Sequence, residues 1–135
     1  MLSPVSTKQP RELLETPELF ADLNVPISKE YSTGIHHHDA VAAQLQSVIA
    51  YTVKSVIKTQ GRRQKIVAEQ AGMDYKRLYR LLRGETWMKM SDIVGLSRAL
   101  DMDLARAVEH RGSEETAHWR FVNVQRLPLK KDNQD

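Results

Sequence analysis

The chain has 135 residues and a mass of 15.5 kDa, enough for one compact domain with a tail at each end. Its hydrophobic content of 41% supports a buried core, and its lack of cysteine excludes disulfides, thiolate metal sites and thiol nucleophiles. The net charge is only +3, but residues 54–89 contain ten Lys or Arg against three acids and therefore carry +7. This clustering indicates a polyanionic partner, DNA or RNA ahead of a membrane surface, with a solvated basic face as the plainer alternative.

The first 35 residues are predicted to be an N-terminal arm or linker that is partly disordered. They contain four of the five prolines and no sustained periodicity, and they lack the apolar run of a signal peptide. A short helical turn is expected around "RELLETPELFADL" (11–23), whose apolar side chains are able to dock on the core.

Residues 36–112 are predicted to form the folded domain. Apolar residues recur at helical spacing from Asp39 to about Thr59, which predicts a long amphipathic helix that stops at Gly61 and does not span a membrane. Shorter helices are expected at 64–71, 75–83, 92–100 and 104–111, with Asp74, Ser91 and Asp103 as caps for the last three. The predicted fold class is therefore all-α, with five helices joined by tight turns.

Residues 113–135 have a different texture. "HWRFVNVQRLPL" (118–129) is rich in β-branched and aromatic residues, which predicts an extended C-terminal β segment followed by a disordered tail. A single strand needs a partner, either within the chain or in a second copy. The candidate dimerisation residues are Trp119, Phe121, Val122 and Val124. A monomer is the alternative, if this strand or the N-terminal arm folds back on the domain.

The segment 75–83 combines a core side and a basic side on one helix. At about 100° per residue, Lys76, Arg80 and Arg83 share one face, while the leucines of "YKRLYRLLR" share the opposite face. Almost no carboxylates stand three or four residues away to neutralise these cations. Gly72, between this helix and the preceding one, suits a tight turn that needs a positive φ.

"QKIVAEQAGMDYKRLYRLLRGE" (64–85) resembles the helix-turn-helix of the lambda-repressor-like family, which includes Cro, phage repressors and XRE-like proteins. "LSRALDMDLARAV" (96–108) is similar to a later segment of the same family, although Asp101 stands where the family has glycine. The resemblance covers about residues 39–111. The matching positions in the first segment are Gln64, Val67-Ala68, Gly72-Met73-Asp74, Leu78 and Gly84.

This resemblance implies that helix 75–83 enters the major groove of double-stranded DNA, where Lys or Arg commonly contacts guanine. The expected base contacts are Tyr75, Lys76, Arg77 and Arg80. The expected phosphate contacts are Gln64, Arg62, Arg63, Lys65, Arg83, Thr86, Trp87 and Lys89.

Four of these or neighbouring side chains also have a structural alternative. Tyr75 is able to pack on the core leucines, and Tyr79 more readily covers the edge of the core than DNA. Trp87 is equally suited to sealing the core or lying along the DNA backbone, and Arg83 is suited to the helix C-terminus.

Catalytic and metal sites are not indicated. "GIHHHD" (34–39) places histidines side by side, where they cannot converge on one metal in a rigid geometry, and no motif for a nucleophile or a nucleotide loop is present. We therefore expect no enzyme activity, no cofactor and no metal.

The function expected from the sequence is that of a sequence-specific DNA-binding transcriptional regulator, with a repressor of temperate-phage or mobile-element type favoured. Its place would be the cytoplasm of a bacterium or of a phage-infected host, its partners an operator and a second copy. The alternatives are an antitoxin-type autoregulator whose C-terminal tail binds a partner protein, and a DNA-bending excision or architectural factor.

Overall fold

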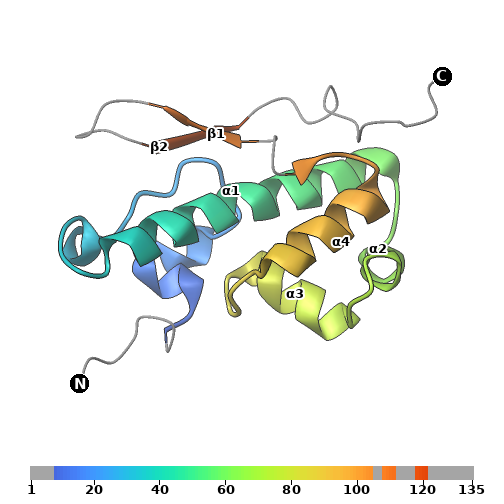
Figure 1. Cartoon of the computed structure of the whole chain (residues 1–135), viewed down its shortest axis with the longest axis horizontal. Helices are drawn as coiled ribbons and strands as arrows, with labels where there is room; N and C mark the ends of the chain where they lie inside the picture. Colours follow the sequence, from blue (N-terminus) through green and yellow to red (C-terminus); the bar gives the residue numbers. More distant parts are fainter. Residues whose placement is uncertain (1–7, 105–107, 112–117, 122–135) are drawn as a thin grey trace.

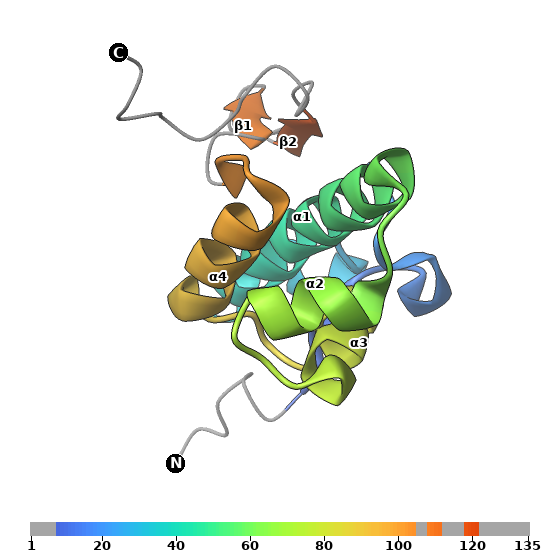
Figure 2. The same ribbon diagram turned by 90° about the vertical axis from the view of Figure 1, so that its right-hand side faces the viewer.

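The computed structural model describes residues 8–104, 108–111 and 118–121 of the chain, the last two ranges as backbone only. Within these residues lie four α-helices: α1 (His37–Gln60), α2 (Gln64–Gln70), α3 (Tyr75–Arg83) and α4 (Met90–Leu100). The backbone also forms two short strands, β1 (Val108–Arg111) and β2 (His118–Phe121), which pair antiparallel. Both views show α1 lying along one side of the three shorter helices, with the β1–β2 pair on the side of α1 away from α3 (Figures 1 and 2).

The predicted fold class is wrong in its number of helices and in its C-terminal segment. The described residues form four helices, and part of the predicted fifth helix, 104–111, is strand β1. The pairing of Val108 with Phe121 and of Arg111 with His118 gives these residues cross-strand backbone partners, and such a non-local pairing cannot be read from the helical spacing of the local sequence. Of the predicted C-terminal β segment (118–129), the structure describes only the four residues of β2, and the others lie outside the described residues.

The main core joins all four helices. It is formed by buried apolar side chains on the inner face of each helix, and Met102 and Leu104 close it after α4. The buried helix residues are Ile49, Ala50, Val53, Val56, Ile57, Val67, Ala68, Leu78, Leu82, Leu96 and Leu100. The helical periodicity of the sequence therefore identifies most of this core.

Left-handed residues end three of the helices. Gly61 and Gly84 end α1 and α3 with φ of 66° and 74°, as expected for glycines after a last helical turn. Asp101 ends α4 with φ 58°, so an aspartate adopts the left-handed conformation here. The lambda-repressor-like family, which this segment resembles, has glycine at the same position. The helix α4 begins at Met90 rather than after Ser91, because the Asp92 carboxylate accepts a hydrogen bond from the Lys89 N–H at 2.7 Å.

The N-terminal segment is packed against the helices rather than forming a loose arm over its described part. Three short 3-10 helices, Pro10–Leu13, Pro17–Leu19 and Lys29–Tyr31, connect through backbone hydrogen bonds such as Glu15 N–H to Pro26 O at 2.8 Å. Its buried side chains form a second cluster with α1. The members of this cluster are Leu13, Leu14, Val25, Tyr31, Ala40 and Ala43.

The same segment braces the end of α3. The Arg11 N–H donates to the carbonyl of Gly84 at 3.0 Å, and the Phe20 ring lies so close to Gly84 that a Cβ there would be 2.7 Å from it. The Trp87 indole donates to the Lys8 carbonyl at 3.0 Å and packs against the second cluster. Trp87 therefore seals the N-terminal segment onto the loop after α3.

The side-chain amide of Gln46 ties α1 to that loop. Its Nε2 donates to the carbonyls of Leu81 and Thr86 at 3.1 and 3.0 Å, and its Oε1 accepts from the Met88 N–H at 2.9 Å. The side chain of Gln46 is 4% exposed, and its bond to the Leu81 carbonyl is buried, whereas its bonds to Thr86 and Met88 are partly buried. One buried amide thus fixes where α3 ends and how the chain turns toward α4.

Gln46→Leu is expected to destabilise the fold by about 1–3 kcal/mol, because it removes three hydrogen bonds between a buried side chain and the backbone around the end of α3. Denaturant unfolding checks the stability, and native-state hydrogen exchange checks the Met88 amide, which should exchange faster than in the wild type. Gln44→Leu, which removes one longer bond of 3.3 Å to the Val25 carbonyl, is the matched control and should cost less. Equal effects of the two substitutions would contradict this role for Gln46.

Gly95→Ala is expected to destabilise the fold by about 1–3 kcal/mol, because the new methyl overpacks the contact between α2 and α4. A Cβ at Gly95 would lie 2.4 Å from the carbonyl oxygen of Ala71, a backbone atom that cannot rotate away. Thermal unfolding followed by circular dichroism measures the change. Val94→Ala, at a neighbouring exposed position of the same helix, is the control and should leave the melting temperature nearly unchanged.

Candidate nucleic-acid interface

The helix α3 has one buried side and one exposed basic side, as its sequence predicts. Its three leucines are buried, whereas Lys76 and Arg80 are exposed one turn apart. Neither cation makes a hydrogen bond or ion pair within the described part of the chain, although the charge of Arg80 acts on the nearby Glu85 carboxyl. The structure therefore leaves two adjacent cations available to an external anion or base edge.

Two tyrosines and an arginine form a row beside these cations. Tyr75 and Tyr79 are 41% and 45% exposed, and their ring centroids lie 6.4 Å apart. The guanidinium carbon of Arg83 lies 5.3 Å from the centre of the Tyr79 ring, within cation–π range. Both tyrosines therefore keep much of their surface in solvent. The prediction that Tyr79 covers the edge of the core describes only the buried part of this side chain.

The carboxylate of Glu85 holds Arg83 in this row. Arg83 Nε donates to Glu85 Oε2 at 2.8 Å, and Arg11 Nη1 lies 3.6 Å from the same oxygen. The hydrogen bond from Arg83 lowers the pKa of Glu85 despite its desolvation, and the charges of Arg83, Arg11 and Arg80 add to this effect. Arg83 is thus partly neutralised within the chain, unlike Lys76 and Arg80.

Arg77, predicted to contact bases, is held by an acid of the same chain. Its Nε donates to Asp92 Oδ1 at 3.0 Å, and its Nη2 donates to Asp92 Oδ2, a bidentate pair that links α3 to the start of α4. Burial would raise the pKa of Asp92, but hydrogen bonds from Arg77 and the Lys89 N–H outweigh it, so the pKa lies below its usual value. Arg77 is therefore better described as a positioning residue that orients α3 against α4.

Arg62, predicted to contact phosphate, also has internal partners. Its Nη1 donates to the Ala99 carbonyl at 2.6 Å and to Gln60 Oε1 at 3.0 Å, and Gln60 Nε2 donates to the Leu100 carbonyl at 3.2 Å. These bonds satisfy carbonyls at the C-terminus of α4, where a cation is also favoured by the helix dipole. Arg62 thus joins the α1–α2 connection to α4.

The remaining predicted phosphate contacts divide by exposure. Arg63, Lys65 and Lys89 have exposed side chains around α2 and the start of α4. Gln64 is half-buried at the edge of a pocket, and Thr86 lies half-buried in the loop fixed by Gln46. The three exposed cations therefore lie on the segments before and after α3 in the chain, where their charges are open to solvent.

The dimerisation prediction falls largely outside the described structure. Trp119 and Phe121 lie in β2, which is described by its backbone pairing alone, and Val122 and Val124 lie outside the described residues. The β1–β2 pair is on the far side of α1 from α3 (Figure 1). An interface there would leave the exposed side of α3 uncovered.

Two structural roles were not predicted from the sequence. Gln46 appears in the sequence only as a polar interruption of an apolar stretch, and nothing local indicates its distant backbone partners. Asp92 had a local signal, because an acid three residues after Lys89 at a helix start suits a cap. Its second partner, Arg77, is 15 positions away and is brought close only by the packing of α3 on α4.

The histidines and the long helix α1 concern two other kinds of site, a metal centre and a membrane span. No group of three or more His, Asp or Glu side chains there is placed to share a metal ion, and His37 Nδ1 instead lies 3.0 Å from the Tyr31 carbonyl oxygen. The helix α1 is long and apolar enough to cross a membrane by length and composition, but 61% of its apolar window is buried inside the protein. It therefore has the character of a core helix.

Comparisons with models of protein families, with curated proteins and with solved structures found no significant match to this chain. The assignment of the surface consequently depends on its geometry and charge.

Asp92→Asn is expected to reduce the free energy of unfolding by about 1–3 kcal/mol near neutral pH, because it weakens a charge-assisted pair whose acceptor is 7% exposed. The folded-state pKa of Asp92 is depressed, so its stabilisation is present above the unfolded-state value of 3.8 and is lost as the pH falls through the lower folded-state value. Denaturant unfolding between pH 7 and pH 2 should show the wild type and the variant converging in acid. Glu69→Gln, at an exposed position on α2, is the control and should show no such convergence.

Proposed function

We propose that this protein is a sequence-specific regulator that binds double-stranded DNA by inserting α3 into the major groove. The observation that carries the proposal is the exposed pair Lys76 and Arg80 on a short helix whose opposite side is anchored in the core. An α-helix of this kind fits the major groove, where each base pair presents a distinct set of donors and acceptors. The resemblance of residues 64–85 to a lambda-repressor-like helix-turn-helix supports the same orientation.

Base recognition is assigned to Lys76, Arg80 and the two tyrosines. Lys76 and Arg80 are suited to the N7 and O6 acceptors of guanine, so guanines are expected in the binding site. The exposed rings of Tyr75 and Tyr79 offer apolar surface for thymine methyl groups and hydroxyls for hydrogen bonding. Arg77 leaves this set because its guanidinium is paired with Asp92.

Phosphate contacts are assigned to Arg63, Lys65 and Lys89, whose side chains are exposed beside α3. Each such contact releases counterions and makes binding sensitive to salt, without reading the sequence. Arg83 is a weaker candidate, because a phosphate would have to compete with Glu85 for its guanidinium. The proposed surface therefore has a central reading helix flanked by cations.

Repression is the favoured consequence of such binding. A small protein seated in the major groove at a promoter would exclude polymerase from the operator by occupying it. A cytoplasmic protein of temperate-phage or mobile-element type remains our proposal, and pairing of two copies on a two-fold symmetric site is part of it.

Lys76→Ala and Arg80→Ala should each cost roughly 1–3 kcal/mol on the preferred sequence and relax its base preference, because each removes a contact to a base edge. Selection of bound sequences from a random duplex pool, followed by binding titrations, measures both effects. The double variant should lose any guanine-containing motif that the wild type enriches. Arg98→Ala, at an exposed position near the end of α4, is the control and should keep the motif.

Unchanged specificity in the double variant would rule out α3 as the reading helix. Salt-sensitive binding to every duplex, with no enriched motif in the wild type, would instead favour an architectural protein that bends DNA. A palindromic motif would support two copies on the site, and a single asymmetric motif would support one.

A further inference from the structure

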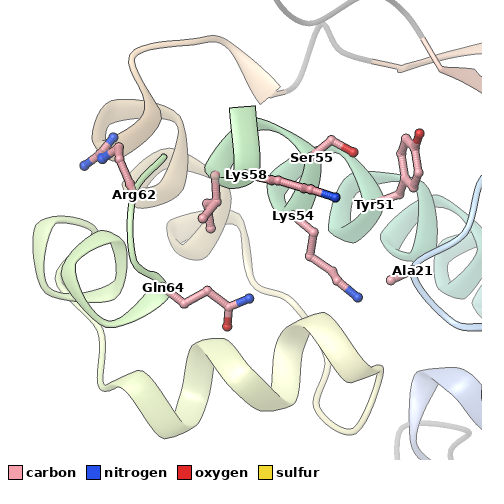
Figure 3. A pocket seen from close by; sticks show the side chains of 8 residues that line it. Ala21, Tyr51, Lys54, Ser55, Lys58, Arg62 and Gln64 are labelled. Atoms are coloured by element: carbon pink, nitrogen blue, oxygen red, sulfur yellow. The ribbon is translucent and has the colours of Figure 1, made fainter. Parts of the chain in front are cut away.

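A pocket of about 520 Å³ lies beside the α1–α2 connection, and none of its lining residues belongs to the set assigned to DNA in the proposed function. Its walls come from the last turns of α1, from the start of α2 and from the turn at Ala21 in the N-terminal segment (Figure 3). Besides Ala21, the lining residues that bear on its chemistry are Lys54, Ser55, Lys58, Arg62 and Gln64.

The pocket is cationic. Lys54 and Lys58 stand one turn apart on α1, and no acidic side chain lines the pocket. Like charges at this spacing repel each other and slightly lower the stability of a helix. A negatively charged ligand bound between the two lysines would remove this repulsion. Arg62 adds a third positive charge at the rim, although its guanidinium is held at the end of α4.

Neutral donors accompany these cations. The Ser55 hydroxyl and the Gln64 side-chain amide line the same space, and each is able to donate to an anionic oxygen. In Figure 3 the side chains of Lys54 and Gln64 extend into this space from α1 and α2. Two ammonium groups, a hydroxyl and an amide match the several acceptor oxygens of a phosphate better than they match a carboxylate.

The far rim of the pocket is held in a fixed shape. Ala21 has a φ of 74°, which is unfavourable for a residue with a side chain. The Ser47 hydroxyl secures this turn, because its oxygen accepts from the Ala21 and Asp22 N–H groups at 2.9 and 3.2 Å. The rim is therefore set before any ligand arrives.

We infer that this pocket is a phosphate-binding site in which Lys54 and Lys58 neutralise the charge while Ser55 and Gln64 donate hydrogen bonds. The phosphate comes either from the backbone of the DNA that α3 contacts or from a soluble polyphosphate. Gln64 begins α2, the first helix of the helix-turn-helix, so a DNA strand flanking α3 has a route to the pocket. Only the DNA source rests on the proposed function, whereas the site itself does not.

The test uses the full chain, with Lys54→Gln/Lys58→Gln as the pocket variant and Lys29→Gln/Arg98→Gln as a control of equal charge change. Lys29 and Arg98 are exposed and lie outside the pocket. Pyrophosphate is titrated while the amide signals of Ser55 and Gln64 are followed by NMR. In parallel, the affinity for a duplex is measured against salt concentration.

Two results support the site, and they identify the source of the phosphate. If the source is DNA, the slope of log K against log salt becomes shallower by roughly 0.9 for each lysine that neutralises a phosphate, with equal loss on all sequences. If the source is soluble, pyrophosphate saturates the Ser55 and Gln64 signals in the wild type and binds at least about tenfold more weakly in the pocket variant. The control variant should resemble the wild type in both measurements.

The inference is overturned if the pocket variant matches the control variant in both its salt slope and its pyrophosphate titration. The proposed function fails if the wild type binds no duplex. The pocket assignment still stands in that case if the wild type binds pyrophosphate and the pocket variant does not. The two failures are therefore distinguishable.

Discussion

The buried amide of Gln46 is the interaction on which the geometry of the proposed interface depends. It binds two carbonyls and one N–H around the end of α3, so the long core helix α1 directly sets where α3 stops and where α4 starts. A hydrophobic side chain would fill the same space without fixing these backbone groups. The N-terminal segment reinforces the arrangement from outside, through Phe20 over Gly84 and the Arg11 N–H on the Gly84 carbonyl.

The basic segment divides its cations between structure and binding. Arg77 and Arg62 each hold a neighbouring element, one through the Asp92 carboxylate and the other through a carbonyl at the end of α4. Arginine suits this work because its planar fork forms two directed hydrogen bonds. Lys76 and Arg80, with no such partner within the described residues, remain exposed on the opposite side of α3 from its core leucines. A cluster of like charge thus serves two different purposes.

These two groups of cations also explain how binding and stability are separable. Removing Lys76 or Arg80 takes away no hydrogen bond or ion pair described within the chain, so its effect should appear in binding to the partner. Removing Arg77 leaves the Asp92 carboxylate, which is nearly buried, with the Lys89 N–H but without its ion-pair partner. A substitution of Arg77 that impairs function would therefore act by changing the orientation of α3, not by removing a contact to a base. Such a change should also appear as a loss of stability.

The sequence by itself determined the four central helices, most of their buried faces and the two sides of α3, because these follow from local periodicity and from glycines such as Gly61, Gly72 and Gly84. It did not determine that the segment after Leu104 pairs as strands, since Val108 meets Phe121 across thirteen positions of chain. Nor did it show that Arg77 belongs to Asp92, that Gln46 organises a distant loop, or that Lys54 and Gln64 line one pocket. Only the tertiary structure decided these, because each depends on which side chains meet when separate helices pack.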